Sequence, residues 1–209
     1  MARYSYPSCI RSACLALTGL TILAFASGCS STKSYGDWQG PKPLLLPYSK
    51  ILIVVDTPYT ELRQELEQQL LAGATQGGTL ATAAINLESG NQAVTQQSLV
   101  VMLEEAYADS LLLVKFSHRI LASDGDLDTA INIAPQTGFV TQTELPSLAN
   151  NSALVDTTIY DIMQGGRPVY VIDIETIFRD KGPDTVYYAA VDLADVILDE
   201  LISVKIIDD

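Results

Sequence analysis

Asp56 is the first residue whose type and position could support chemistry. It follows the apolar run Ile51–Val55, and a phosphoryl-transfer site of the Asp-x-Asp-x-Thr type places its nucleophile directly after such a run. Pro58 stands where that pattern has its second acid, so there is no general acid for the leaving group and one fewer oxygen for Mg²⁺. The segment therefore favours a strand end followed by a helix.

His118 and the pair Asp173 and Glu175 are the other candidates for catalysis. His118 is the only histidine of the chain, so a transition metal would need carboxylates around one imidazole. A Ser-His-Asp triad stays open, although no Gly-x-Ser-x-Gly elbow is present. Asp173 and Glu175 alternate on one strand face, as a carboxylate pair could, but any half-exposed strand gives this spacing. We interpret His118 as structural and assign no catalytic residue.

Two further patterns resemble ligand sites only in part. Asp124, Asp126 and Asp128 alternate as calcium ligands do, but an EF-hand loop needs Gly and Glu where this chain has Thr129 and Pro135. We interpret the three acids as a solvated turn and leave a looser Ca²⁺ contact open. We predict no metal and no cofactor.

The glycines between Gly73 and Thr79 have the spacing of a phosphate-binding loop. The lysine that would reach the phosphates is absent, and the segment follows a predicted helix instead of a strand. We predict a connection between a helix that stops at Gly73 and a strand.

The hydrophobic pattern predicts the elements that must position these residues. Strands are expected at 48–56, weakly at 79–87, at 111–120 and at 169–178. Helices are expected from Thr57 and Pro58, with Leu62, Leu66 and Leu70 facing inward and Glu67 on the polar side, then over 91–109 and from Asp184 to the end. The fold class is α/β, with α+β left open: a small mixed sheet of about four to six strands, two helices in the first half and one C-terminal helix.

The domain organisation follows from composition. Residues 1–28 read as a leader, residues 29–47 as a flexible tether rich in Ser, Gly and Pro, and residues 48–209 as a single domain. Within that domain, residues 122–166 are rich in Thr, Asn, Asp and Gly and are expected to be irregular, with a hairpin turn at 135–138. Such loops often carry recognition.

The charge excludes one class of partner. The formal net charge is −13, and it becomes −15 without the leader because Arg3 and Arg11 are the leader's only charged residues. An acidic surface repels phosphate backbones, so we expect no nucleic-acid partner. Adhesion to anionic headgroups by charge alone is equally disfavoured.

The leader ends in a lipidation motif. Basic Arg3 and Arg11 precede the uncharged apolar segment 13–26, about 21 Å long as a helix and so too short for a hydrocarbon core of about 30 Å. The next residues, Ala26-Ser27-Gly28-Cys29, resemble the lipobox of bacterial lipoproteins. This resemblance implies that the Cys29 thiol accepts a diacylglycerol and that Cys29 becomes the first residue of the mature chain. Because Cys9 and Cys14 leave with the leader, no internal disulfide is possible.

The lipobox also implies a location. Acyl chains hold a protein stably on a membrane. Ser30, where an aspartate would favour the inner membrane, points by the family rule to the outer membrane facing the periplasm. The alternative is an ordinary signal peptide cleaved elsewhere.

Three stretches carry a more distant resemblance. KILIVVDTPYTELRQELEQQL, YADSLLLVKF and VYVIDIETIFRD, followed by the terminal helix, resemble the small α/β domains of several envelope lipoproteins that have no established function. A similar plan occurs in the TolB N-terminal domain and in the curli-secretion and Pel-export lipoproteins. The resemblance implies an envelope component of α/β fold.

Two functions remain open on these grounds. The first is a non-enzymatic envelope lipoprotein whose domain binds a protein partner or forms a homo-oligomer. The second is a periplasmic-side hydrolase that uses carboxylates or a metal. The scarcity of histidines, cysteines and marked nucleophiles favours the first.

Overall fold

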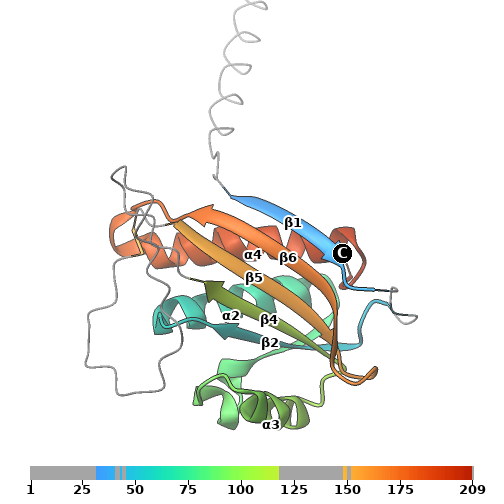
Figure 1. Ribbon diagram of the computed structural model, residues 1–209. Coiled ribbons are helices and arrows are strands. Elements are labelled where there is room, and N and C mark those ends of the chain that lie inside the picture. Colours follow the sequence, from blue (N-terminus) through green and yellow to red (C-terminus); the bar gives the residue numbers. More distant parts are fainter. Residues whose placement is uncertain (1–31, 41–42, 44–45, 118–147, 150–151, 209) are drawn as a thin grey trace, which may run out of the picture. The chain divides into compact units, whose positions relative to one another are not determined.

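A six-stranded mixed sheet is the centre of the structure, a computed structural model that describes residues 32–40, 43, 46–117, 148–149 and 152–208 (Figure 1). The strands are β1 (Lys33–Trp38), β2 (Lys50–Asp56), β3 (Leu80–Ala83), β4 (Ser110–Ser117), β5 (Ser152–Asp161) and β6 (Arg167–Ile177). Their order across the sheet is β1-β6-β5-β4-β2-β3. Strand β2 is parallel to β3 and β4, and the other pairs are antiparallel.

Three α-helices of the described residues cover this sheet. They are α2 (Thr60–Gln76), α3 (Gln96–Ala106) and α4 (Thr185–Ser203), and the 3₁₀ turns are η2 (Ala84–Asn86), η3 (Glu88–Asn91) and η4 (Gly182–Asp184). Helices α2 and α4 pack on one face, behind the sheet in Figure 1. Helix α3 packs on the other face, over β2 and β4. The predicted α/β fold with a C-terminal helix is confirmed.

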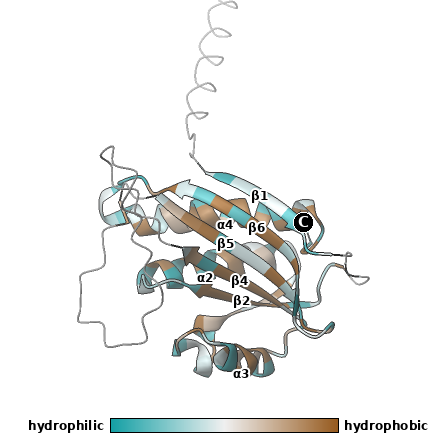
Figure 2. Cartoon of the chain, viewed as in Figure 1, coloured by the Kyte–Doolittle hydropathy of each residue, from teal (hydrophilic) through white to brown (hydrophobic). Residues whose placement is uncertain are grey.

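Strands β2 and β4 are apolar on both sides because helices cover them from both sides. Ile51, Ile53 and Val55 of β2 point to α2 and α4, whereas Leu52 and Val54 point to α3. Figure 2 shows this difference between strands: β2 and the body of β4 are hydrophobic, while hydrophilic residues interrupt β6. A continuous apolar run is what a strand buried on both faces requires.

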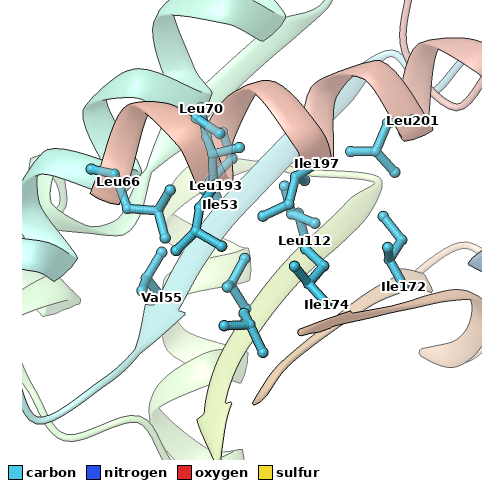
Figure 3. Packing of buried hydrophobic residues seen from close by; sticks show 14 of the residues in the cluster. Ile53, Val55, Leu66, Leu70, Leu112, Ile172, Ile174, Leu193, Ile197 and Leu201 are labelled. Carbon is cyan, nitrogen blue, oxygen red and sulfur yellow. The ribbon is translucent and has the colours of Figure 1, made fainter. Parts of the chain in front are cut away.

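The main core lies between the sheet and the pair α2 and α4 (Figure 3). Leu66 and Leu70 of α2 meet Leu193 and Ile197 of α4 above the strands, all at 1% exposure or less. These residues recur every three or four positions, so one stripe of each helix faces the sheet. The predicted stripe of α2, which includes Leu62, is confirmed, and the predicted C-terminal helix buries a stripe of the same kind.

The N-terminal strand corrects the predicted tether. Residues 33–38, expected to be flexible, pair with β6 over six register positions as edge strand β1. The segment has no apolar run, because an edge strand buries little and takes its stability from backbone hydrogen bonds and from Trp38. The Trp38 ring packs edge-on against Tyr170 at 4.9 Å between centroids.

Strand β5 corrects the predicted irregular segment at 122–166. Within that segment, Ser152–Asp161 form β5, a ten-residue strand between β4 and β6. The strand alternates at period two, but its buried positions include Ala153 and Thr157 as well as Val155 and Ile159, so the apolar signal is weak. The predicted turn at 135–138 lies outside the described residues.

The boundaries of α2 also differ from the prediction. The helix begins at Thr60 with no side-chain cap, and Thr57 Oγ1 only accepts a 3.4 Å hydrogen bond from the Tyr59 nitrogen. Gly73 does not stop the helix, which continues to Gln76. A Cβ at position 73 would overlap Leu198, so this glycine lets α4 approach α2 closely. Helix α3 is shorter than the predicted 91–109 and begins at a capping box formed by Thr95 and Ser98.

Candidate functional site

One face of the antiparallel half of the sheet is the candidate site. Strands β5 and β6 bury the side that faces α2 and α4, and their opposite side is exposed or half-buried. We call this opposite side, with the adjoining parts of β1 and β4, the open face. Its side chains are Lys33, Tyr35, Asp37, Lys115, Leu154, Asp156, Thr158, Val171, Asp173 and Glu175.

Strand register aligns charged side chains across the open face. Lys115 of β4 is the partner of Asp156 of β5, Asp156 is the partner of Asp173 of β6, and Asp173 is the partner of Tyr35 of β1. Directly opposed antiparallel residues have Cβ atoms about 4.5–5.5 Å apart, so the two aspartate side chains leave neighbouring strands next to each other. Ser117 Oγ also donates a hydrogen bond to Asp156 Oδ2 at 3.1 Å, which holds this carboxylate in place.

The candidates Asp56 and Asp173 lie on this same side of the sheet but not together. Asp56 is the register partner of Lys115, so the strand order separates it from Asp173 by three strand spacings, about 14 Å. Asp173 and Glu175 share the open face and are exposed, as the alternation predicts. The neighbour that the sequence did not reveal is Asp156, because its strand lies in the segment predicted to be irregular.

Glu67 is the second polar feature that sequence reasoning misplaced. It was expected on the polar side of its helix, yet its exposed fraction is 0%. Its Oε1 accepts hydrogen bonds from the Val55 nitrogen at 3.0 Å and from Arg63 Nε at 3.1 Å, and its Oε2 accepts one from the Ile85 nitrogen at 2.7 Å. Burial raises the pKa of Glu67. The hydrogen bonds from the backbone and from Arg63 lower it, but burial has the larger effect.

Arg63 forms an ion pair with Glu67, and its other contact shows what the pair does. Its guanidinium Nη2 donates to the Gly90 carbonyl oxygen at 2.7 Å, in addition to its contact with Glu67. The pair thus joins helix α2 to strand β2 and to the 3₁₀ turns η2 and η3. Its hydrogen bonds are made within the protein, so the arrangement is that of a structural connection.

A third polar cluster lies at the end of the sheet where β5 turns into β6. The Asp161 carboxylate accepts hydrogen bonds from Gln164, whose side-chain oxygen accepts one from Arg167. Tyr48 Oη and Arg167 Nε are buried beside this cluster. Burial and the nearby Asp161 carboxylate raise the pKa of Tyr48. These groups order the β5–β6 turn.

Several predicted positions lie outside the described residues. They are Cys29, His118, Asp124, Asp126 and Asp128. Within the residues that are described, no group of three or more acidic, histidine or cysteine side chains is arranged to hold a metal ion. Among those same residues, no helix is long and apolar enough to cross a bilayer.

The glycine segment is the predicted connection between a helix and a strand. It forms the last turn of α2 and a tight turn at Gly78, where φ is +95°. Thr79 follows, and its Oγ1 accepts a hydrogen bond from the Asp208 nitrogen at 3.0 Å. The segment therefore joins α2 to β3 and ties down the C-terminal end of the described chain.

Comparisons with known proteins give fold similarity at low identity. No family model and no curated protein matches the chain. Two solved structures of the PelC dodecamer from Paraburkholderia phytofirmans are similar at 10% identity and a TM-score of 0.47, covering 80% and 81% of this chain and 96% of theirs. A minor lipoprotein from Acinetobacter baumannii is similar at 15% identity and a TM-score of 0.34, covering 79% of this chain and 98% of that one. These values support no inference about function.

Proposed function

We propose that this chain is an envelope lipoprotein, anchored at Cys29, whose folded part binds a protein partner or a second copy of itself. The anchor is supported by the apolar, uncharged segment before Ala26-Ser27-Gly28-Cys29 and by the single cysteine of the mature chain. Ser30 supports the outer membrane, facing the periplasm, as the site of attachment.

The observation that carries the binding role is the pairing of Asp156 with Asp173 on the open face. Like charges directly opposite each other on neighbouring strands destabilise a sheet, so this pair costs the fold stability. A partner that places a basic side chain between the two carboxylates would turn this repulsion into attraction. The exposed Tyr35 ring beside Asp173, 63% accessible, adds the aromatic contact that interfaces favour.

A carboxylate-dependent hydrolase is the second candidate, and the same pair favours it. Two adjacent carboxylates are the groups that general acid and base catalysis uses. The open face presents them on strands with Asp173 exposed to solvent, whereas catalysis usually draws its strength from a concave site that excludes water. The binding role therefore fits this geometry better.

Metabolic labelling with a fatty acid tests the anchor. We expect label on the wild-type protein and none on Cys29→Ser, which would be released or remain an unprocessed precursor. Cys14→Ser, which changes a leader cysteine, is the control and should keep the label. Unchanged label on Cys29→Ser would refute the anchor.

Crosslinking in cells tests the binding role. A photoreactive amino acid at Tyr35 should capture a defined partner, and Asp173→Lys should abolish the capture because it places a cation where a basic partner would bind. The control is Asp192→Lys, which reverses an exposed charge on α4, away from the open face. If Asp173→Asn keeps the crosslink but fails to complement a deletion strain, the hydrolase replaces the binding module.

A further inference from the structure

The folded unit begins at Thr32, only three residues after the proposed lipid anchor Cys29 in the sequence. Thr32 Oγ1 makes a 2.9 Å hydrogen bond with Thr176 Oγ1, and β1 then pairs with β6 up to Trp38. After the strand, the Gln39 nitrogen donates to the Val169 carbonyl oxygen at 2.8 Å. The chain is therefore held to the sheet from Thr32 to Gln39, and this part of the predicted tether does not act as a spacer.

The length of chain between anchor and sheet limits how far the domain stands from the membrane. From Cys29 to Thr32 there are three peptide steps, which span at most about 11 Å in any conformation. If Cys29 carries the lipid, as the proposed function states, the end of the sheet that holds Thr32 stays within reach of the headgroup layer.

The side chains at that end suit a membrane interface. Strand β6 ends there beside the start of β1, and η4 leads from β6 into the first turn of α4 (Figure 1). Ile177, Tyr187 and Tyr188 are 50%, 49% and 47% exposed. The tyrosine rings pack edge-to-face at 5.5 Å, and Lys181 Nζ lies 5.8 Å from the centre of the Tyr188 ring.

The charge where β1, β6 and α4 meet also differs from that of the whole chain. Lys33, Arg179 and Lys181 are balanced there by three acids, Glu175, Asp180 and Asp184, whereas Asp56 and Glu61 lie farther along the same end of the sheet, beyond β5 and β4. A corner without net charge is not repelled by phospholipid headgroups as the rest of an acidic protein is. Tyrosine rings, apolar in body and polar at the tip, are enriched where headgroups meet acyl chains.

We propose that this end, which carries Lys33, Ile177, Lys181, Tyr187 and Tyr188, contacts the headgroup layer of the membrane that holds Cys29. The β5–β6 turn at Met163 then points away from the membrane, because β6 runs for about 35 Å between the two ends. The open face stands between them and is reached from the side. This inference rests on the proposed lipid anchor and adds an orientation to it.

Site-specific fluorescence on the full lipidated protein tests the orientation. The protein is reconstituted in vesicles of phosphatidylethanolamine with a minor share of phosphatidylglycerol, containing headgroup-nitroxide lipid as quencher. Tyr188→Cys and Met163→Cys each introduce one reactive thiol, since Cys29 is acylated through its sulfur. Both sites are exposed, at 47% and 79%, so labelling should not disturb the fold.

We expect several-fold stronger quenching at position 188 than at position 163. Equal quenching at the two positions overturns the proposed orientation. Fatty-acid labelling of the same preparations distinguishes failure of the lipid anchor from failure of the orientation. If the wild-type protein carries no label, the proposed anchor is wrong. If it carries label but quenching is equal at the two positions, only the proposed orientation is wrong.

A lengthened tether tests whether the tyrosines themselves contact lipid. A Gly/Ser insertion of about 20 residues between Ser31 and Thr32 gives a mean reach of about 25 Å and removes the constraint. With the fluorophore at Tyr187→Cys, we expect quenching to persist while Tyr188 is present and to fall in the added variant Tyr188→Ser. Loss of quenching with Tyr188 intact shows that only the short tether held the domain and overturns the contact.

Discussion

The Glu67 carboxylate on helix α2 accepts a hydrogen bond from the backbone nitrogen of Val55 on strand β2, at 3.0 Å. Val55 has no exposed surface, so this nitrogen has no access to water. The same carboxylate accepts a hydrogen bond from the Ile85 nitrogen at 2.7 Å. One side chain thus satisfies two backbone donors at the end of a central strand and in the turn beside it.

Replacing Glu67 should therefore destabilise the protein strongly. Glu67→Leu leaves the buried Val55 N–H, the half-buried Ile85 N–H and Arg63 without this acceptor, and we expect a loss of about 3 kcal/mol in the free energy of unfolding. Glu67→Gln keeps one acceptor oxygen and should lose about 1–2 kcal/mol. Urea unfolding of a chain starting at Ser30 measures both. The exposed Glu61→Gln is the control, and an equal loss there would contradict the assignment.

The ionisation of Glu67 should make the free energy of unfolding depend on pH. Burial raises its pKa above the usual 4.5, so its contribution is fully present below about pH 4.5 and is lost as the pH rises through the higher folded-state pKa. The stability of the wild type relative to Glu67→Gln should therefore decline as the pH rises above 4.5. Unfolding free energies of both proteins across this range decide the point, and a difference that grows with pH would refute it.

Truncation before β2 should cost stability, although the predicted domain began at residue 48. Without β1, the Tyr170 ring loses Trp38 and β6 becomes an exposed edge. We expect a chain of residues 48–209 to melt several degrees below one of residues 30–209, since about 2 kcal/mol shifts the midpoint by roughly 4–8 °C at this size. Calorimetry of the two chains measures the shift.

Gly36→Ala provides an independent check on β1. A Cβ at this position would overlap the hydroxyl of Tyr170 and the Glu200 carboxylate to which that hydroxyl donates. In the longer chain this substitution should reproduce much of the loss seen on truncation. Asp37→Ala, on the neighbouring open-face position, should leave the melting temperature nearly unchanged; equal effects of the two would mean that β1 is not packed in this way.

Elements with a strong apolar signal could be predicted from the sequence, and elements with a weak one could not. Strand β2 and helix α4 were predictable because burial on two faces, or a long stripe, gives runs that periodicity detects. Strands β1 and β5 were missed because β1 is an edge strand and because two of the buried positions of β5 are Ala153 and Thr157.

The candidate site was predictable only as far as its strands were. Asp173 and Glu175 could be placed on one exposed face because β6 alternates cleanly. Their neighbour Asp156 comes from β5 and was therefore missed. Glu67 could not be recognised as buried, because its two backbone partners, Val55 and Ile85, come from separate segments of the chain.

Reversing the charge of Asp173 should stabilise the fold while it abolishes partner binding. In Asp173→Lys the cross-strand row becomes Lys115, Asp156 and a new cation, so the charges alternate instead of repelling. We expect a gain of about 0.5 kcal/mol in the free energy of unfolding. The gain should shrink at high salt, because exposed charges are screened. Urea unfolding at low and high ionic strength measures it.

Glu175→Lys is the matched control two residues along the same strand. Glu175 faces Lys33 on β1 and Leu154 on β5, so its reversal replaces an attractive pair by a repulsive one and should destabilise the protein by a similar amount. Shifts of the same sign for both variants would show that the cross-strand pairs do not control stability here. The expected result is that the two variants change the free energy of unfolding in opposite directions. If Asp173→Lys is then more stable but no longer crosslinks its partner, the acidic pair serves binding at the expense of the fold.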